Sequence, residues 1–200
     1  TSMNAVESAL QEAAINKVVK LRESVIGTLN PSFKPIIDNW SVWTSGEITV
    51  GRKSATSTAS EQKIDSQSIH IGFDKPLENG KGVVGVALGV GLDKTNIGTS
   101  TSNVKANNYA LSAYGEIYPY DDITLEGIIG VGHIQFDTTR KDGVSTFTGN
   151  RDADQIFGSL RIKGDLSGNE NDIDKQNWSV HPYAKLEMSH TKFEKFSENG

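Results

Sequence analysis

The sequence contains no cysteine, no excess of positive charge and no long hydrophobic run. Without cysteine the chain forms neither disulfides nor thiolate metal sites. Its formal net charge of -5 argues against nucleic acid as the main partner, because phosphate binding needs a basic surface. A run of about 18 apolar residues, which a transmembrane helix needs, does not occur. A membrane β-barrel is not excluded, because its strands cross the bilayer with about 9–11 residues that are apolar only at alternate positions.

Sequence motifs for catalysis and ligand binding are also missing. The serines include no Gly-x-Ser-x-Gly elbow, and the glycines from Gly85 to Gly91 lie inside a strand-like pattern rather than between a strand and a helix. The four histidines, at positions 70, 133, 181 and 190, are spread over three predicted strands without a metal-binding spacing. We therefore predict no catalytic residue, no cofactor and no metal.

The first thirty residues have a helical pattern. Between Asn4 and Ile26 there is no glycine or proline, and apolar side chains recur at spacings of three and four. Asn4 with Glu7 resembles a capping box, and Gly27 is a credible stop. We predict an amphipathic helix whose second half carries the cations Lys17, Lys20 and Arg22. The start of the chain does not resemble a signal peptide, so we expect a piece of a longer protein.

From Trp40 onward the apolar period changes to two. The clearest strand places Val84, Val86, Leu88, Val90 and Leu92 on one face, opposite a face of Gly85, Ala87, Gly89 and Gly91. Side chains this small indicate that something bulky approaches the sheet closely, and the predicted helix is the candidate. The alternation predicts seven strands, at 42–52, 68–74, 83–92, 109–117, 123–136, 156–163 and 178–193.

Two irregularities accompany this pattern. In the fifth predicted strand the apolar phase slips from Val131 to Ile134, which predicts a β-bulge near Gly132. The predicted connections mostly alternate between long (54–63, 94–102, 141–151) and short (75–81, 119–122), a habit of outer-membrane barrels. The segment 164–176 is long where a short turn is due.

Charged and aromatic side chains follow the same alternation. The inward phase carries seven ionisable residues, which in a barrel would face an aqueous lumen and pair with one another or with the helix cations. The alternative is the solvated face of a soluble sheet. Several aromatics near strand ends fit an interfacial girdle: Trp43, Tyr109, Tyr118, Tyr120 and Trp178. The inward ionisable residues are Glu47, Asp74, Glu116, Arg161, Lys163, Lys185 and Glu187.

Five short segments in order resemble the β-domain, or translocator, of the bacterial autotransporters (type V secretion). The segments are Trp43-Thr44-Ser45-Gly46, Ser68-Ile69-His70-Ile71-Gly72-Phe73-Asp74, Val86-Ala87-Leu88-Gly89, Tyr109-Ala110-Leu111-Ser112-Ala113-Tyr114-Gly115 and His181-Pro182-Tyr183-Ala184-Lys185-Leu186-Glu187. The resemblance implies an all-β fold: an antiparallel up-and-down (meander) transmembrane β-barrel preceded by an N-terminal amphipathic α-helix that threads the lumen. It implies a division into a linker helix and connector at 1–39 and a barrel domain at 40–200.

The family's barrel has twelve strands and ends in an aromatic residue, whereas this chain ends at Ser197-Glu198-Asn199-Gly200. We therefore expect an incomplete barrel that lacks its C-terminal portion. Its first and last strands would then present unpaired edges, which promote association with other chains.

The resemblance also implies the function: a non-enzymatic pore in the bacterial outer membrane that anchors and exports an N-terminal passenger domain. The implied partners are outer-membrane lipids, the chain's own passenger and the outer-membrane barrel assembly machinery. Some members cut themselves after an asparagine in the lumenal helix. The cleaving members carry Asn-Asn, whereas Asn16 is followed by Lys17 here, which disfavours self-cleavage.

Two other functions remain open at this stage. One is a soluble β-barrel or sandwich that binds a small apolar ligand, and the other is a cell-surface adhesin module with Ser/Thr-rich loops. Extraction separates them from the translocator, because a membrane barrel does not stay in the soluble fraction without detergent.

Overall fold

The computed structural model describes residues 39–57, 60–98, 102–167 and 179–199. The predicted helix with Lys17, Lys20 and Arg22 lies outside the described residues, as does Trp178. Within the described part of the chain, no helix has the length and hydrophobicity needed to cross a bilayer.

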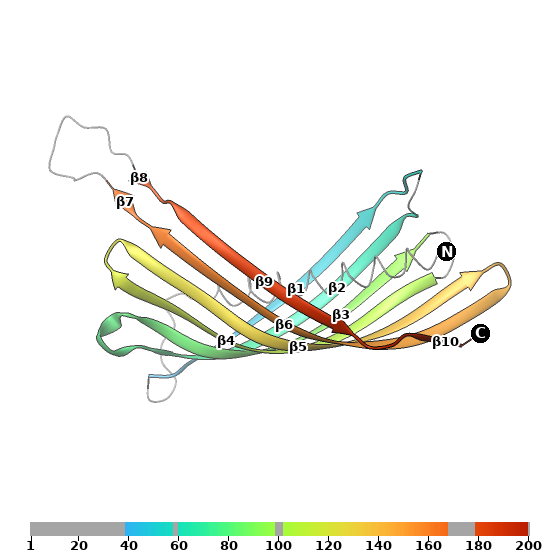
Figure 1. The fold of residues 1–200 in the computed structure, drawn as a ribbon, viewed down its shortest axis with the longest axis horizontal. Helices are drawn as coiled ribbons and strands as arrows, with labels where there is room; N and C mark the ends of the chain where they lie inside the picture. Colours follow the sequence, from blue (N-terminus) through green and yellow to red (C-terminus); the bar gives the residue numbers. More distant parts are fainter. Residues whose placement is uncertain (1–38, 58–59, 99–101, 168–178, 200) are drawn as a thin grey trace.

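One antiparallel sheet follows the order of the chain and curves into a trough (Figure 1). The all-β antiparallel meander that the family resemblance implies is thus confirmed. In the described residues β1 pairs with β2 alone and β9 with β6 alone, so the sheet is open at both edges. The long strands are β1 (Ser41–Lys53), β2 (Gln62–Pro76), β3 (Gly82–Ile97), β4 (Ser102–Tyr120), β5 (Ile123–Asp142), β6 (Ser145–Gly164) and β9 (Tyr183–Phe193).

Four short elements complete the described chain. A 3-10 turn, η1 (Glu78–Gly80), connects β2 to β3. The strands β7 (Leu166–Ser167) and β8 (Ser179–Val180) pair with each other, and β10 (Ser197–Asn199) pairs with the far end of β6. The predicted strand 178–193 is therefore interrupted at His181 and Pro182.

Of the predicted long connections, the first stays long, at 54–61 between β1 and β2, whereas the other two, at 94–102 and 141–151, are much shorter than predicted. β3 continues to Ile97 and β4 begins at Ser102, while β5 and β6 meet in a turn at 143–144, where Gly143 has a φ of 61°. These segments are rich in Ser, Thr and Asn, but ladder hydrogen bonds form between backbones and do not require apolar side chains. Strands β2 to β6 have 15 to 20 residues, more than the roughly 9–11 that cross a bilayer.

The predicted bulge near Gly132 is also wrong. The pairing of β5 with β4 and with β6 continues through Gly132, and the register shift lies in β4 between Ile117 and Tyr120. The apolar phase changes because Ile134 and Phe136 turn to the inward face, where they are buried in a hydrophobic cluster. This cluster consists of Ile97, Val104, Ala106, Ile134, Phe136 and Ala153, with Phe193 packed against it.

Candidate functional site

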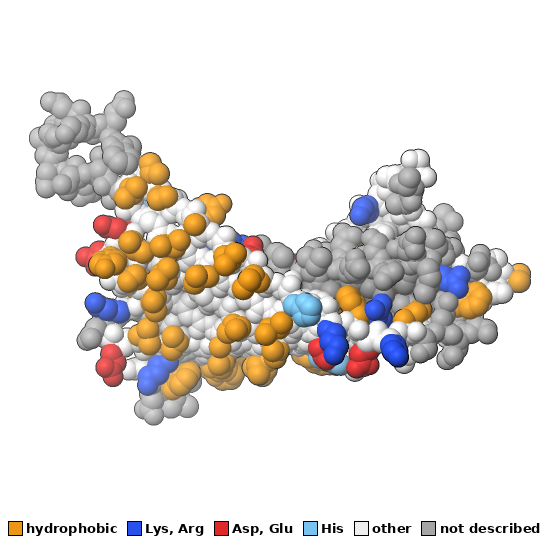
Figure 2. All heavy atoms as spheres, viewed as in Figure 1, with side chains coloured by type: hydrophobic (Ala, Val, Ile, Leu, Met, Phe, Trp, Pro, Cys, Tyr) orange, Lys and Arg blue, Asp and Glu red, His pale blue; other side chains and the backbone are white. Residues whose placement is uncertain are grey.

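The outward, convex face of the sheet carries a broad band of exposed hydrophobic side chains. On β3 alone, the outward series from Val84 to Leu92 is 43–58% exposed. Figure 2 shows hydrophobic side chains spread over one part of this face and charged side chains gathered beyond it. Soluble monomers rarely expose apolar patches larger than a few hundred Å². The face therefore suits an apolar surrounding better than water.

The edge of this apolar band runs diagonally across the strands. The last apolar outward residue is Leu92 on β3 and Met188 on β9. Met188 of β9 lies in the same ladder row as Val86 of β3, and the row passes through Gly158, Ile129 and Ala113. Leu92 lies six residues beyond Val86 on β3. From β3 to β9, four strands away, the edge of the band therefore shifts by six residues. At about 3.3 Å per residue and about 4.8 Å per strand, the slope is about 45°. Strands of transmembrane barrels tilt by about 35–45°.

An aromatic cluster occupies the inward face near the start of β1. The indole Nε1 of Trp43 donates a hydrogen bond to the Tyr114 hydroxyl at 2.6 Å, and that hydroxyl donates to Oδ2 of Asp74 at 3.0 Å. Trp43 is only 2% exposed, so its predicted place in an interfacial girdle is wrong. Its hydrogen-bonded partners explain the inward position, because a buried indole N–H needs an acceptor.

Two glycines make room for these rings. A Cβ at Gly72 would overlap the Trp43 ring, and a Cβ at Gly85 would lie 2.6 Å from the Tyr114 ring. At Gly85 the bulky neighbour is therefore Tyr114, whereas the sequence pattern predicted the helix as the neighbour of this face. Ala87 is buried in the same cluster, together with Ile128 and Phe157. Gly89 and Gly91 continue this inward face of small residues and are buried.

Gly72→Ala is expected to destabilise the folded chain by about 1–3 kcal/mol, since the new methyl overpacks Trp43. In a Trp43→Ala background the same change should cost little, because the indole is gone. Urea titration of all four proteins measures this coupling. Gly46→Ala is the control, because a Cβ at Gly46 would make only an ordinary contact of 3.7 Å with the Ser68 carbonyl. Additive losses would contradict the packing.

The seven ionisable residues predicted for the inward phase all lie on the inward side of the ladder. One ladder row joins Glu116, Glu126, Arg161 and Lys185, and Glu47 lies toward the opposite end of the sheet. Lys185 Nζ lies 2.8 Å from a carboxylate oxygen of Glu187. Asp74 belongs to the aromatic cluster instead. The structure thus gathers most of these charges near the short-turn end.

Glu126 is the centre of the charge cluster, although it is not among the inward residues predicted from the sequence. Its carboxylate accepts a hydrogen bond from Arg161 Nε at 2.6 Å and pairs with Lys163 Nζ, while its side chain is 1% exposed. The signal was present, because Glu126 alternates with the outward Leu125 and Ile129. One buried anion therefore holds two cations on the inner wall.

An ion pair closes the rim of the first hairpin. Arg52 Nη2 donates to Glu61 Oε2 at 2.6 Å, and Lys63 Nζ lies 3.9 Å from the other oxygen. The hydrogen bond from Arg52 lowers the pKa of Glu61 from its ordinary value. A lowered carboxyl pKa contributes stability above the pKa of the unfolded chain, and this contribution is lost as the pH falls through the folded value.

The histidines do not converge on a metal site. In the described part of the chain, no group of three or more His, Cys, Asp or Glu side chains has a metal-binding arrangement. His133 Nδ1 lies 2.8 Å from Asp154 Oδ1 on the outward face, and His181 Nδ1 lies 3.4 Å from Asp165 Oδ1. The other ring nitrogen of His133, Nε2, lies 3.9 Å from Asp152 Oδ2, so His133 contacts two carboxylates and His181 contacts one.

Comparisons with known proteins agree with the geometry. The family model described as "Autotransporter beta-domain" matches residues 42–200. Among solved structures, the translocator domain of the autotransporter NalP from Neisseria meningitidis is similar, with a TM-score of 0.69 and 15% sequence identity. The match covers 100% of this chain and 65% of that domain, so the chain spans less than two thirds of its length. No curated protein matches the sequence.

Proposed function

Because the chain belongs to the autotransporter β-domain family, we propose that it forms part of an outer-membrane translocator that anchors and exports an N-terminal passenger domain. The proposal places the outward band in lipid and the inward face toward an aqueous lumen. The protein would act as a non-enzymatic pore of the bacterial outer membrane. Its passenger, the surrounding lipids and the barrel assembly machinery would be its partners.

The diagonal apolar band is the observation that carries this proposal. In a soluble sheet, nothing requires the hydrophobic side chains to end along a line inclined by about 45° to the ladder rows. A tilted barrel in a bilayer requires such a line, because the membrane surface cuts every strand at the same angle. The strands that protrude beyond the band, on the side of 54–61 and 98–101, would face the cell exterior.

Fractionation tests the proposal directly. Membranes from cells that make the intact protein are washed with carbonate and then extracted with detergent. The protein should stay in the washed membranes and dissolve only with detergent. Recovery in the aqueous fraction would favour the soluble β-barrel or sandwich instead.

The charge distribution supports a lumenal position for the predicted helix of residues 4–26. The inward acids Glu47, Asp74 and Glu116 lie on β1, β2 and β4, around the small-residue face of β3. Two cations of the wall, Arg161 and Lys185, lie on β6 and β9. The helix cations Lys17, Lys20 and Arg22 would therefore face the acidic half of the wall. In this proposal residues 1–39 supply the plug and connector, and residues 40–200 belong to the barrel.

Replacing Gly89 by Trp should expel or loosen the helix and raise the ion conductance of the pore. A helix with its side chains is about 10–12 Å across, so it approaches the wall closely only where inward side chains are small. Deleting residues 1–26 should raise the conductance similarly, and the combined change should add little, since both remove the same plug. Planar-bilayer recordings of the four proteins provide the measurement. Independent, additive increases would show that the helix does not pack on β3.

A further inference from the structure

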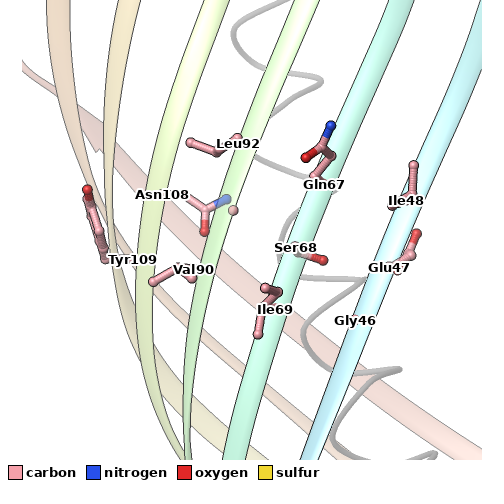
Figure 3. A pocket seen from close by; sticks show the side chains of 11 residues that line it. Gly46, Glu47, Ile48, Gln67, Ser68, Ile69, Val90, Leu92, Asn108 and Tyr109 are labelled. Atoms are coloured by element: carbon pink, nitrogen blue, oxygen red, sulfur yellow. The ribbon is translucent and has the colours of Figure 1, made fainter.

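A groove with a volume of about 590 Å³ lies on the outward face of β1 to β4 (Figure 3). Gly46 has no side chain and leaves a gap beside Ile48, and the remaining outward lining comes from three neighbouring strands. Figure 3 shows these side chains along the groove. The outward lining of β2, β3 and β4 is Gln67, Ile69, Val90, Leu92 and Tyr109. The groove is thus almost entirely apolar and lies at the edge of the band.

Two lysines stand beyond this groove. Lys94 is the next outward residue after Leu92 on β3, and Lys105 of β4 lies directly opposite Lys94 in the ladder. Their Cβ atoms are therefore about 4.5–5.5 Å apart, a spacing at which like charges repel. Both lysines are exposed. The row continues to Asp65 on one side and Asp137 on the other. Neither lysine belongs to any of the ion pairs within 4.0 Å in the described residues.

A second outward groove, of about 850 Å³, lies around Gly158 on β5, β6 and β9. It is apolar like the first, but its polar end is different. His190 lies at that end, and Lys192, which follows on the same face of β9, stands opposite Asp154. The second groove therefore has similar apolar walls, but a histidine and one lysine lie at its polar end where the first groove has two lysines directly opposite each other, and it serves as an internal control.

We propose that the first groove binds a membrane lipid with a phosphate-bearing headgroup, its acyl chain against Ile48, Ile69 and Leu92 and its phosphate between Lys94 and Lys105. This inference rests on the proposed function, because it needs the outward band to lie in the membrane. Lys94 and Lys105 are one and two alternations beyond the last apolar residues of their strands, Leu92 and Tyr109. That is where headgroups meet a barrel wall. A phosphate there relieves the repulsion between the two ammonium groups.

The leaflet follows from the direction of the strands. Lys94 and Lys105 lie on the side of the connection 98–101, away from the short turn at 121–122. Short turns of outer-membrane barrels face the periplasm. The lipid would therefore belong to the outer leaflet, and a phosphorylated glycolipid such as lipid A supplies both the acyl chains and the phosphate.

The test uses the intact protein in zwitterionic detergent micelles, with bisphosphorylated lipid A as the probe and native mass spectrometry as the readout. The double variant Lys94→Gln with Lys105→Gln should weaken the apparent affinity about 30-fold. Each lysine near a charged lipid surface contributes a similar factor to the affinity, and the two factors multiply to about this value. Lys63→Gln is the matched control on the same face, since Lys63 already lies 3.9 Å from Glu61. It should change the affinity by less than about threefold.

The groove has its own pair of variants. Gly46→Leu fills the first groove and should weaken binding about tenfold, because the acyl chain then loses part of its apolar contact with the groove. Gly158→Leu fills the second groove and should leave lipid A binding unchanged. Higher salt should weaken binding by the natural protein more than by the double lysine variant.

Three results would overturn the inference. They are equal affinity of the double lysine variant, equal affinity for lipid A stripped of its phosphates, and equal losses from Gly46→Leu and Gly158→Leu. Inorganic phosphate is added as a competitor. If it displaces lipid A at low millimolar concentration while Gly46→Leu has no effect, the site binds a free anion rather than a lipid. If the protein stays in washed membranes but fails these tests, only the lipid site is contradicted. If the protein is found in the aqueous fraction, the proposed function is contradicted as well.

Discussion

Replacing Glu126 by leucine is expected to lower the free energy of unfolding by about 2–3 kcal/mol. Removing one partner of a fully buried ion pair costs about 3–5 kcal/mol, because a charge is left without compensation. The cost is smaller here, since the Arg161 and Lys163 side chains are 28% and 40% exposed and water screens the charges that remain. Urea unfolding of the membrane-inserted protein measures the difference.

Two further variants distinguish charge from packing at Glu126. Glu187→Gln is the control, because Glu187 pairs with Lys185 on the same face but its side chain is 43% exposed. It should cost less than about 1 kcal/mol. A triple variant with Glu126→Leu, Arg161→Leu and Lys163→Met should recover most of the lost stability, since hydrophobic replacement of a whole ionic cluster is often neutral. If the triple variant is as unstable as Glu126→Leu, the loss comes from packing.

The sequence predicted the outward face well because one physical requirement acts on every second residue. Side chains such as Leu88, Leu111 and Ile129 must all suit an apolar surrounding, and that requirement produces a period of two. The phase assigned to β2, β3 and β4 from this period matches the structure. The alternation needs no knowledge of which strands are neighbours.

The inward face was harder to predict because the positions of its residues depend on contacts with partners far along the chain. Trp43 and Tyr114 are 71 residues apart and meet only when four strands are in register. Phe136 turns inward because Ile97 and Ala153 provide an apolar neighbourhood there, and the sequence alone made this look like a bulge. The burial of Glu126 likewise depends on cations about 35 residues away.

The strand ends were mispredicted for a related reason. Beyond the apolar band the outward face of the strands carries polar and charged residues, and the apolar side chains lie on the inward face, in the cluster around Phe136. The outward hydrophobic alternation therefore disappears while the ladder continues. The pairs Lys94 with Lys105 and Asn96 with Asn103 are examples from β3 and β4. Their composition is typical of loops, yet their backbones are paired.

Leu88→Arg is expected to lower the free energy of unfolding by about 2–4 kcal/mol, the cost of a cation at the bilayer midplane on a barrel's lipid face. Leu88 is the middle residue of the outward series from Val84 to Leu92 and is 52% exposed on that face. Arginine at this position must lose its hydration or drag water into the band. Folded yield in membranes and urea unfolding in vesicles both measure the effect.

The controls for Leu88→Arg separate lipid contact from the size of the side chain. Asn96→Arg lies on the same face of the same strand but beyond the band, where the cost falls to about 0–1 kcal/mol. Thr49→Arg places the cation on the inward face beside Glu47, whose carboxylate lies 2.7 Å from the Thr49 hydroxyl. Ser112 has the inward phase too, but it is buried with its hydroxyl 3.5 Å from the Ala87 carbonyl, so arginine there would report packing instead. Equal losses for Leu88→Arg, Asn96→Arg and Thr49→Arg would remove the basis for placing this face in lipid, because only the first puts a cation inside the apolar band.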